Sequence, residues 1–298
     1  MASPVTNHFA GSVMRLSRSI ALLLPAALPL AAAAGFAGCV EEPDAEGSVD
    51  SRTAQSCPPE VPLCRRVLLP FVGHPAAPRV PGDLLDLRAW KLTLPVGEPE
   101  APREVKQPEL RAFSLSPYFE LDAGGHAVRF RAPVGGVTTR GSVYPRSELR
   151  EMTPDGLGRA AWSSTSGRHT LVLRQAITHL PNATPAVVAG QIHDADRDLL
   201  AIRLEGERLF VDLWGADDVV LDAHYQLATP FAVRLEVYEG RLRLFYNDAP
   251  TPALDRPFVA SGCYFKAGCY PQSNVAGGES PNAYGEVKLF ALQVSHTE

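Results

Sequence analysis

Apolar and polar residues alternate along most of the chain after about residue 83, the spacing that turns one face of a β-strand toward a core. The alternation is clearest in five stretches: 126–132, 168–177, 200–213, 231–244 and 287–294. Two of these stretches contain a turn at Gly206 or Gly240 between two alternating runs, which is typical of an antiparallel hairpin. The pattern therefore predicts a chain built mainly from short β-strands.

Helical periodicity is scarce in this sequence. No segment keeps a 3.6-residue period for more than two turns, and only 82–89 is expected to form a short helix. Many short strands joined by Gly- and Pro-containing turns indicate an all-β sandwich or barrel with antiparallel sheets.

Composition narrows the function classes. The chain has 298 residues, 45% of them hydrophobic, and a formal net charge of −5. A disordered chain would be poorer in apolar residues, and a protein that binds nucleic acid through bulk basicity would be positive, so both classes are disfavoured. We expect one domain over 81–298, which is long enough to bury its own core.

The N-terminal residues 1–39 have the pattern of an export signal. Two arginines precede an apolar stretch over 20–34 that is short for a membrane-spanning helix. The stretch is followed by Phe-Ala-Gly-Cys39, which resembles a bacterial lipoprotein cleavage site, so we expect a lipid anchor at Cys39 and an outer-membrane or cell-surface lipoprotein. Ordinary cleavage near 31–34, giving a secreted or periplasmic protein, is the alternative.

Residues 40–80 are acidic and rich in proline, as in a solvated tether. Cys57 and Cys64 lie in this tether, and export would permit a small disulfide loop between them. Cys263 and Cys269 are six residues apart on a predicted strand, roughly 20 Å if the strand is straight. That separation is too long for a disulfide, so no pairing is predicted for them.

The segment 144–152 carries the first candidate chemistry. On a strand, Arg146, Glu148 and Arg150 fall on one face. A carboxylate between two guanidinium groups orients them for binding the carboxyl group of an anion. Alone, the same pattern is also typical of a solvated sheet face.

A second segment places Gln191 and His193 on one strand face, with Ile192 pointing to the core. An amide beside a neutral imidazole suits binding of a carboxylate together with removal of a proton, although a surface histidine with a satisfied hydrogen bond fits this segment better when it is taken alone. The acidic residues at 194–198 lack the glycine and the distal glutamate of a calcium loop, so we predict a polar turn and no metal site.

The third segment contains Tyr264, Lys266, Tyr270 and Gln272, which share one strand parity. The small residues at 267 and 268 allow close approach to the backbone between them. Cations near a tyrosine favour its phenolate, which suits the side chain to proton transfer.

These three segments resemble, in the same order, the signature motifs of the alginate lyases of polysaccharide lyase family 7. The likeness spans roughly 83–296, and Trp-Lys-Leu-Thr-Leu-Pro at 90–95 is similar to the family's opening strand. The resemblance implies a β-jelly roll whose concave sheet forms a substrate groove. It also implies β-elimination across a 4-linked uronic acid polymer, without a metal or another cofactor.

The resemblance also implies roles for individual residues. Arg146, Gln191 and His193 would surround the carboxylate of the sugar, and Tyr270 would donate a proton to the departing O4. His193 would be the base for guluronate, whereas Tyr270 would serve as both base and acid for mannuronate. Five further residues would line the groove to hold substrate and orient the catalytic set: Glu148, Arg150, Tyr264, Lys266 and Gln272.

Several functions stay open at this point. Ile192 between Gln191 and His193 is a family feature that leans toward guluronate-containing blocks of alginate. A lyase for another polyuronate, such as polyglucuronate, would use the same chemistry, and a non-catalytic jelly-roll carbohydrate-binding module is the alternative of another class. A glycoside hydrolase is disfavoured because Glu148 and Glu151 lie on opposite strand faces. We expect a monomer that binds an anionic polysaccharide.

Overall fold

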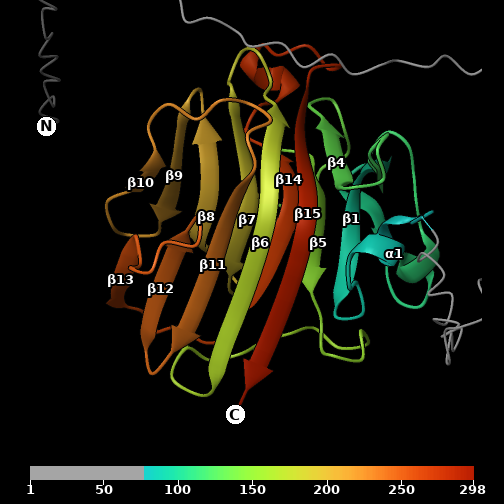
Figure 1. Cartoon of the computed structure of the whole chain (residues 1–298). Coiled ribbons are helices and arrows are strands. Elements are labelled where there is room, and N and C mark those ends of the chain that lie inside the picture. The colour runs from blue at the N-terminus through green and yellow to red at the C-terminus, as the bar shows by residue number, and fades with distance from the viewer. Residues whose placement is uncertain (1–76) are drawn as a thin grey trace, which may run out of the picture. The chain divides into compact units, whose positions relative to one another are not determined.

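The computed structural model describes residues 77–298, which form two antiparallel β-sheets packed face to face. In Figure 1 the strands β6 and β15 of the seven-stranded sheet cross in front of the eight-stranded sheet. The prediction of an all-β jelly-roll sandwich is confirmed. Within residues 77–298, no helix has the length and apolar character needed to span a membrane.

The eight-stranded sheet consists, in spatial order, of β10 (Val219–Asp222), β9 (Arg208–Leu213), β8 (Asp198–Glu205), β7 (Ala186–His193), β14 (Tyr264–Pro271), β5 (Ser147–Glu151), β1 (Trp90–Glu98) and β2 (Ala101–Val105). The seven-stranded sheet consists of β13 (Leu254–Pro257), β12 (Arg241–Tyr246), β11 (Phe231–Tyr238), β6 (Arg168–His179), β15 (Tyr284–Thr297), β4 (Val128–Pro133) and β3 (Phe119–Leu121). Within the described residues there are also three short helices: α1 (Pro81–Leu84), η1 (Glu109–Ala112) and η2 (Val275–Gly277).

Both predicted hairpins are present. The β8–β9 turn has Gly206 at φ +59°, and the β11–β12 turn has Glu239 and Gly240 at φ +52° and +67°. Positive φ at both central positions of a turn, as in β11–β12, or at the first alone, as in β8–β9, matches the twist of the strands that the turn joins. The turn residues therefore fix the register of these two strand pairs.

The helix expected over 82–89 is shorter than predicted. It ends at Leu84, and Leu85 already has an extended backbone (φ −113°, ψ 140°). Leu85 and Leu87 are both buried in the core, with one residue between them. This spacing of two suits an extended segment leading into β1, so core packing overrides the helical tendency of the segment.

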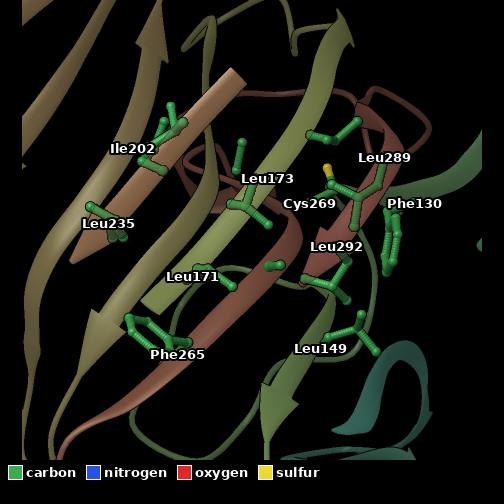
Figure 2. Packing of buried hydrophobic residues seen from close by; sticks show 14 of the residues in the cluster. Phe130, Leu149, Leu171, Leu173, Ile202, Leu235, Phe265, Cys269, Leu289 and Leu292 are labelled. Atoms are coloured by element: carbon green, nitrogen blue, oxygen red, sulfur yellow. The ribbon is translucent and has the colours of Figure 1, made fainter. Parts of the chain in front are cut away.

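The core lies between the two sheets, where alternate residues from each strand meet (Figure 2). Strand β11 shows strict alternation of buried and half-buried residues, as the sequence pattern predicts. Fully buried side chains come from both sheets, and they include Phe130, Leu149, Leu171, Leu173, Phe265 and Leu289. Since one face of the eight-stranded sheet is occupied by this packing, its polar side chains gather on the opposite face.

One polar network crosses the core. The side chain of Glu151 is 1% exposed, and its Oε2 accepts hydrogen bonds from Trp162 Nε1 (3.1 Å) and from the backbone N–H of Phe265 (2.8 Å). Its Oε1 lies 2.5 Å from Nε2 of His296 in the other sheet. Because a buried carboxylate is costly without partners, these contacts tie β5 and β14 to the C-terminal strand β15.

A second histidine extends this network. His169 on β6 meets His296 with 2.8 Å between their Nδ1 atoms. The Nε2 of His169 faces only the carbonyl oxygens of Ser163 and Ser166, so it carries a hydrogen and donates it. Glu151, His296 and His169 thus form one continuous chain of hydrogen bonds from the eight-stranded sheet to the seven-stranded sheet.

Several sequence predictions lie outside the described residues: the export signal over 1–39, the lipid anchor at Cys39, the Cys57–Cys64 loop and nearly all of the tether. Cys263 and Cys269 are described, and both are free and buried. Burial raises the pKa of Cys263 to about 12 and that of Cys269 well above its usual value. Both cysteines are therefore protonated thiols in the core.

Candidate active site

The three motif segments lie on three neighbouring strands in the middle of the eight-stranded sheet. Strand β14 pairs with β5 on one side and with β7 on the other. Lys266 on β14 is in register with Arg150 on β5 and with Gln191 on β7. Tyr264 is in register with His193. The alternation rule therefore brings these predicted site residues onto one sheet face, as expected.

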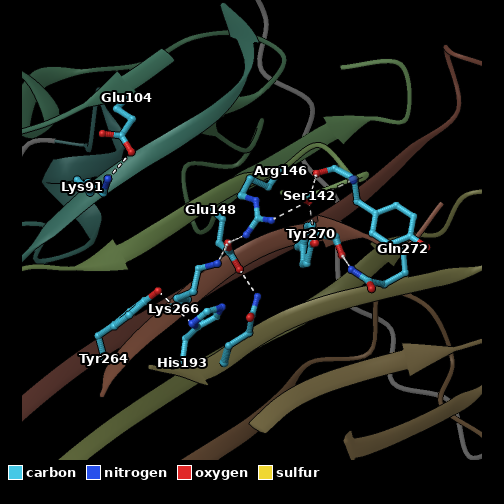
Figure 3. Close-up of polar contacts among 12 residues, drawn as sticks. Lys91, Glu104, Ser142, Arg146, Glu148, His193, Tyr264, Lys266, Tyr270 and Gln272 are labelled. Atoms are coloured by element: carbon cyan, nitrogen blue, oxygen red, sulfur yellow. Dashed lines mark hydrogen bonds and ion pairs between the residues drawn. The ribbon is translucent and has the colours of Figure 1, made fainter. Parts of the chain in front are cut away.

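Glu148 lies at the centre of this arrangement (Figure 3). Its carboxylate accepts hydrogen bonds from Arg146 Nη1 (3.0 Å), Lys266 Nζ (2.6 Å) and Gln191 Nε2 (2.6 Å). Burial opposes its ionisation, but the charges of Lys266 and Arg146 outweigh this and lower the pKa of the carboxyl group. The side chain is only 2% exposed. Of the two roles expected for Glu148, the geometry fits orienting the catalytic set rather than holding substrate.

Lys266 is a buried cation of the site. Burial lowers the pKa of its ammonium group to about 8, although the neighbouring carboxylate of Glu148 works in the opposite direction. The ammonium group is therefore still mainly charged at neutral pH and contributes a positive charge at the floor of the site.

Gly268 lets the strands approach closely at this point. It lies opposite Glu148 in the β14–β5 pair and has φ +138°. A Cβ atom there would lie 2.6 Å from the carbonyl oxygen of Ser147 and 2.9 Å from Cα of Glu148. The residue therefore has to be glycine for both conformational and steric reasons. The next two residues then place Cys269 in the core and Tyr270 at the site.

The imidazole of His193 is fixed in one tautomer. Its Nδ1 lies 2.6 Å from the carbonyl oxygen of Asp194, which can only accept, so Nδ1 carries the hydrogen. The ring also stacks on Tyr264, whose hydroxyl lies 3.1 Å from Nδ1. Burial lowers the pKa of His193, and the charge of Lys266 adds to this. The neutral form, with a free lone pair on Nε2, is the form that acts as a base.

Tyr270 and Arg146 are in direct contact. The guanidinium carbon of Arg146 lies 3.8 Å from the centre of the Tyr270 ring. The Tyr270 hydroxyl lies 3.1 Å from Oγ of Ser142, which also accepts a hydrogen bond from Arg146 Nη2 (3.2 Å). Sequence reasoning missed Ser142, because it lies in a connecting segment with no periodicity that would aim its side chain.

A hollow of about 700 Å³ lies over these strands. Arg146, His193 and Tyr270 line it together with Arg150, Tyr264 and Lys266. Gln191 is 2% exposed and lies beneath the hollow through its bond to Glu148. Gln272 does not line the hollow, and its amide donates to the carbonyl oxygen of Tyr270 (3.3 Å). The structure therefore brings all the candidates except Gln272 into one site.

Charge is distributed unevenly around the hollow. Seven cationic and four anionic side chains line it, so it is formally positive although the whole chain has a net charge of −5. Lys91 and Arg159 belong to this set and were not among the sequence candidates, because their positions depend on strand pairing and on a loop. Lys91 on β1 forms an ion pair with Glu104 on the neighbouring strand β2. The hollow is therefore suited to an anionic ligand.

No group of three or more His, Cys, Asp or Glu side chains within residues 77–298 is arranged to hold a metal ion. The residues at 194–197 form a polar turn, as predicted, and Asp198 is the first residue of β8. Asp194 Oδ1 accepts from the backbone N–H groups of Asp196 and Arg197 (2.8 and 2.9 Å).

Known proteins resemble this chain in sequence and in fold. A family model described as alginate lyase matches residues 85–296. The chain belongs to this family. The solved alginate lyase AlgAT5 of polysaccharide lyase family 7 is 48% identical, with a TM-score of 0.70 over 74% of this chain and 99% of that one. The alginate lyase from Corynebacterium sp. is 43% identical, with a TM-score of 0.70 over 74% and 100% of the two chains.

A curated alginate lyase from Klebsiella pneumoniae is 38% identical over 106 residues. That match spans about a third of the curated relative, 34% of each chain. Since the two solved lyases above are covered almost completely, the described part of this chain is similar to the whole of each. Family membership makes the protein a polysaccharide lyase.

Proposed function

We propose that this lyase cleaves alginate by β-elimination, and that it acts on guluronate-containing blocks. The observation that carries the proposal is the convergence of Arg146, His193 and Tyr270 on one positively charged hollow. A 4-linked uronic acid polymer offers a carboxylate to the cations and a proton at C5 to a base. Binding alone would not need a phenol and a neutral imidazole beside the cationic groups, so this geometry favours catalysis over a carbohydrate-binding module.

The first step is removal of the weakly acidic C5 proton. Arg146 would neutralise the adjacent carboxylate, so that negative charge developing on it is stabilised. His193 would accept the proton at Nε2, because its Nδ1 is already donating to Asp194. Gln191 would contribute by fixing Glu148, which in turn holds Arg146 and Lys266.

The second step is departure of the O4 group from C4. Tyr270 would donate its phenolic proton to this oxygen, leaving a double bond between C4 and C5 in the product. In guluronate the C5 proton and O4 lie on opposite faces of the sugar, which calls for two separate groups. In mannuronate they lie on the same face, where Tyr270 would accept one proton and return it.

His193 supports the proposed preference for guluronate. Its fixed tautomer and lowered pKa provide a base that is distinct from Tyr270. Ile192 is the residue that the family resemblance links to guluronate-containing blocks. It is fully buried in the core, so any effect it has on specificity acts through packing.

The test is incubation with polyguluronate, polymannuronate and polyglucuronate in separate reactions. The product absorbs in the ultraviolet because its new double bond is conjugated with the carboxylate. We expect the ultraviolet absorbance to rise fastest with polyguluronate. A rise with polyglucuronate alone would identify a different polyuronate lyase. Absence of any rise, with polymer binding retained, would favour a binding module instead.

The sequence pattern also leads us to propose an exported monomer that is anchored to the membrane through a lipid on Cys39. Fractionation of cells that produce the full chain tests the anchor. The wild type should be found with membranes, and a Cys39→Ala variant should be soluble. A variant that stays in the membrane fraction would contradict lipid anchoring, and size-exclusion chromatography of the soluble variant tests the monomer.

A further inference from the structure

Ser142 is held by its own loop next to the proposed acid. It lies between β4 and β5, where its backbone N–H donates to the carbonyl oxygen of Thr139 (3.0 Å) across a turn with Gly141 at φ +81°. Its Oγ lies 3.2 Å from the backbone N of Tyr144, which donates to it, and 3.0 Å from the carbonyl oxygen of Tyr144. The hydroxyl is therefore fixed before any substrate binds.

The phenol of Tyr270 depends on this hydroxyl. Within residues 77–298, Ser142 is the one residue that forms a hydrogen bond with the Tyr270 hydroxyl, at 3.1 Å. Arg146 lies over the ring and also donates to Ser142 Oγ. Ser142 is therefore the polar link between the phenol that would donate a proton and the guanidinium that would bind the sugar carboxylate.

Counting donors fixes the direction of the hydrogen bond. A serine oxygen has two lone pairs and one hydrogen. The N–H groups of Arg146 and Tyr144 occupy both lone pairs of Ser142. Its own hydrogen is then shared between the Tyr144 carbonyl and the Tyr270 oxygen. The phenol oxygen accepts from Ser142, which leaves the phenol hydrogen free to point into the hollow.

We propose that Ser142 is a positioning residue that aims the Tyr270 phenol and stabilises the phenolate formed when its proton leaves. The inference rests on the proposed β-elimination. In that step the Tyr270 O–H bond and the C4–O4 bond break, and the electron pair of the C4–O4 bond goes to O4. The new O4–H bond takes the phenolic proton. Ser142 keeps its own proton throughout and only strengthens its hydrogen bond to the Tyr270 oxygen.

The test compares Ser142→Thr with Ser142→Val, which have nearly the same shape but differ in the hydroxyl, and adds Ser142→Ala. Val143→Ala is the control, because Val143 is 63% exposed in the same loop. We expect Val and Ala at position 142 to lower kcat by about 10- to 100-fold, the loss typical of one hydrogen bond to a charged group. KM should stay nearly constant, Thr should retain most of the activity, and the control should match the wild type.

The outcomes separate two failures. A wild type that forms no unsaturated product on any polyuronate would contradict the proposed function, and this inference with it. A wild type that is active while the Val and Ala variants keep its kcat would contradict the role of Ser142 alone. A rise in KM with kcat unchanged would also overturn it, because Ser142 would then act on substrate binding through Arg146. Thermal unfolding of each variant confirms that the compared proteins are folded.

Discussion

Glu148 and Lys266 form a buried ion pair, with 2.6 Å between Oε2 and Nζ, beneath the hollow that carries the proposed chemistry. The same carboxylate holds Arg146 and Gln191, so side chains from three segments share one acceptor. A positive charge at the floor of the site would otherwise repel its neighbours. The carboxylate therefore lets two cations and an amide pack together in a fixed arrangement.

The substitution Glu148→Gln tests this arrangement. It leaves Lys266 and Arg146 without their counter-charge, and breaking a buried pair typically costs about 3–5 kcal/mol. We expect a loss of that order in the free energy of unfolding and at least roughly a 100-fold loss of kcat/KM, equivalent to 2.7 kcal/mol or more. Denaturant unfolding and the ultraviolet assay measure the two effects. Glu109→Gln, which removes an exposed pair with Arg103, should change both by little.

Tyr270→Phe removes only the hydroxyl that would protonate O4. We expect turnover to fall by roughly 10²- to 10⁴-fold, the range for loss of a general acid. Polymer binding should be largely unchanged, because the ring and its contact with Arg146 remain. The measurements are single-turnover rates and binding by calorimetry. A variant with near-normal rates would show that another group is the acid.

His193→Asn distinguishes the two substrate epimers. The variant should lose more activity on polyguluronate than on polymannuronate, because His193 is the proposed base only for the former. Parallel rate measurements on the two polymers test this, and equal losses would contradict the division of roles.

The pH dependence of the wild type follows from the same histidine. Its pKa is lowered by burial, so the neutral base is retained when the pH falls to the usual histidine value of about 6.5. Activity on polyguluronate, measured as kcat/KM, should therefore decline on the acid side with a midpoint below about pH 6.5. A midpoint above that value would exclude His193 as the base.

Gly268→Ala should damage both stability and activity. The new Cβ would clash with the backbone of β5 and would force alanine into a positive φ. We expect a loss of at least about 1–3 kcal/mol in unfolding free energy, together with reduced kcat, because Glu148 lies directly opposite. Gly206→Ala is the matched control: its φ is also positive, but no atom lies within 4 Å of its added Cβ. It should lose stability through the backbone alone and keep its kcat.

Substitution of Glu151 should reduce stability but leave kcat nearly unchanged. Glu151→Ala would leave Trp162 Nε1 and the Phe265 N–H buried without their acceptor and would detach His296. We expect destabilisation by roughly 3–5 kcal/mol, with kcat per folded molecule close to that of the wild type at low temperature. Calorimetric unfolding and active-site titration provide the two numbers. A large fall in kcat with normal stability would show that the network serves catalysis instead.

Much of the fold and of the candidate site could be predicted from local sequence. Alternation gave the strands and the core face, and the glycines at 206 and 240 marked the hairpins, because these signals depend only on neighbouring residues. Parity also separated Glu148 on the site face from Glu151 in the core. These are consequences of the two-residue repeat of a strand, which no tertiary contact can change without a bulge.

Other features depended on partners that are distant in sequence. Ser142 is placed by a turn, and Lys91 by strand pairing, so neither has a local signal. Gln272 shares the parity of Tyr270, yet it follows the last residue of β14, where the rule no longer applies. The expected helix gave way to core packing of Leu85 and Leu87. What local pattern misses is therefore set by register and by loop conformation.

The shared acceptor beneath the hollow also limits how the enzyme can be redesigned. A change at any of the buried side chains that Glu148 holds disturbs the others, so variant libraries directed at the sheet should yield mostly inactive clones. The connecting residues 139–141 and 196–197 line the same hollow and lie outside this network, whereas Ser142 belongs to it through Arg146. An engineer who wishes to alter the block preference or product length should randomise those loops and leave the strands as they are.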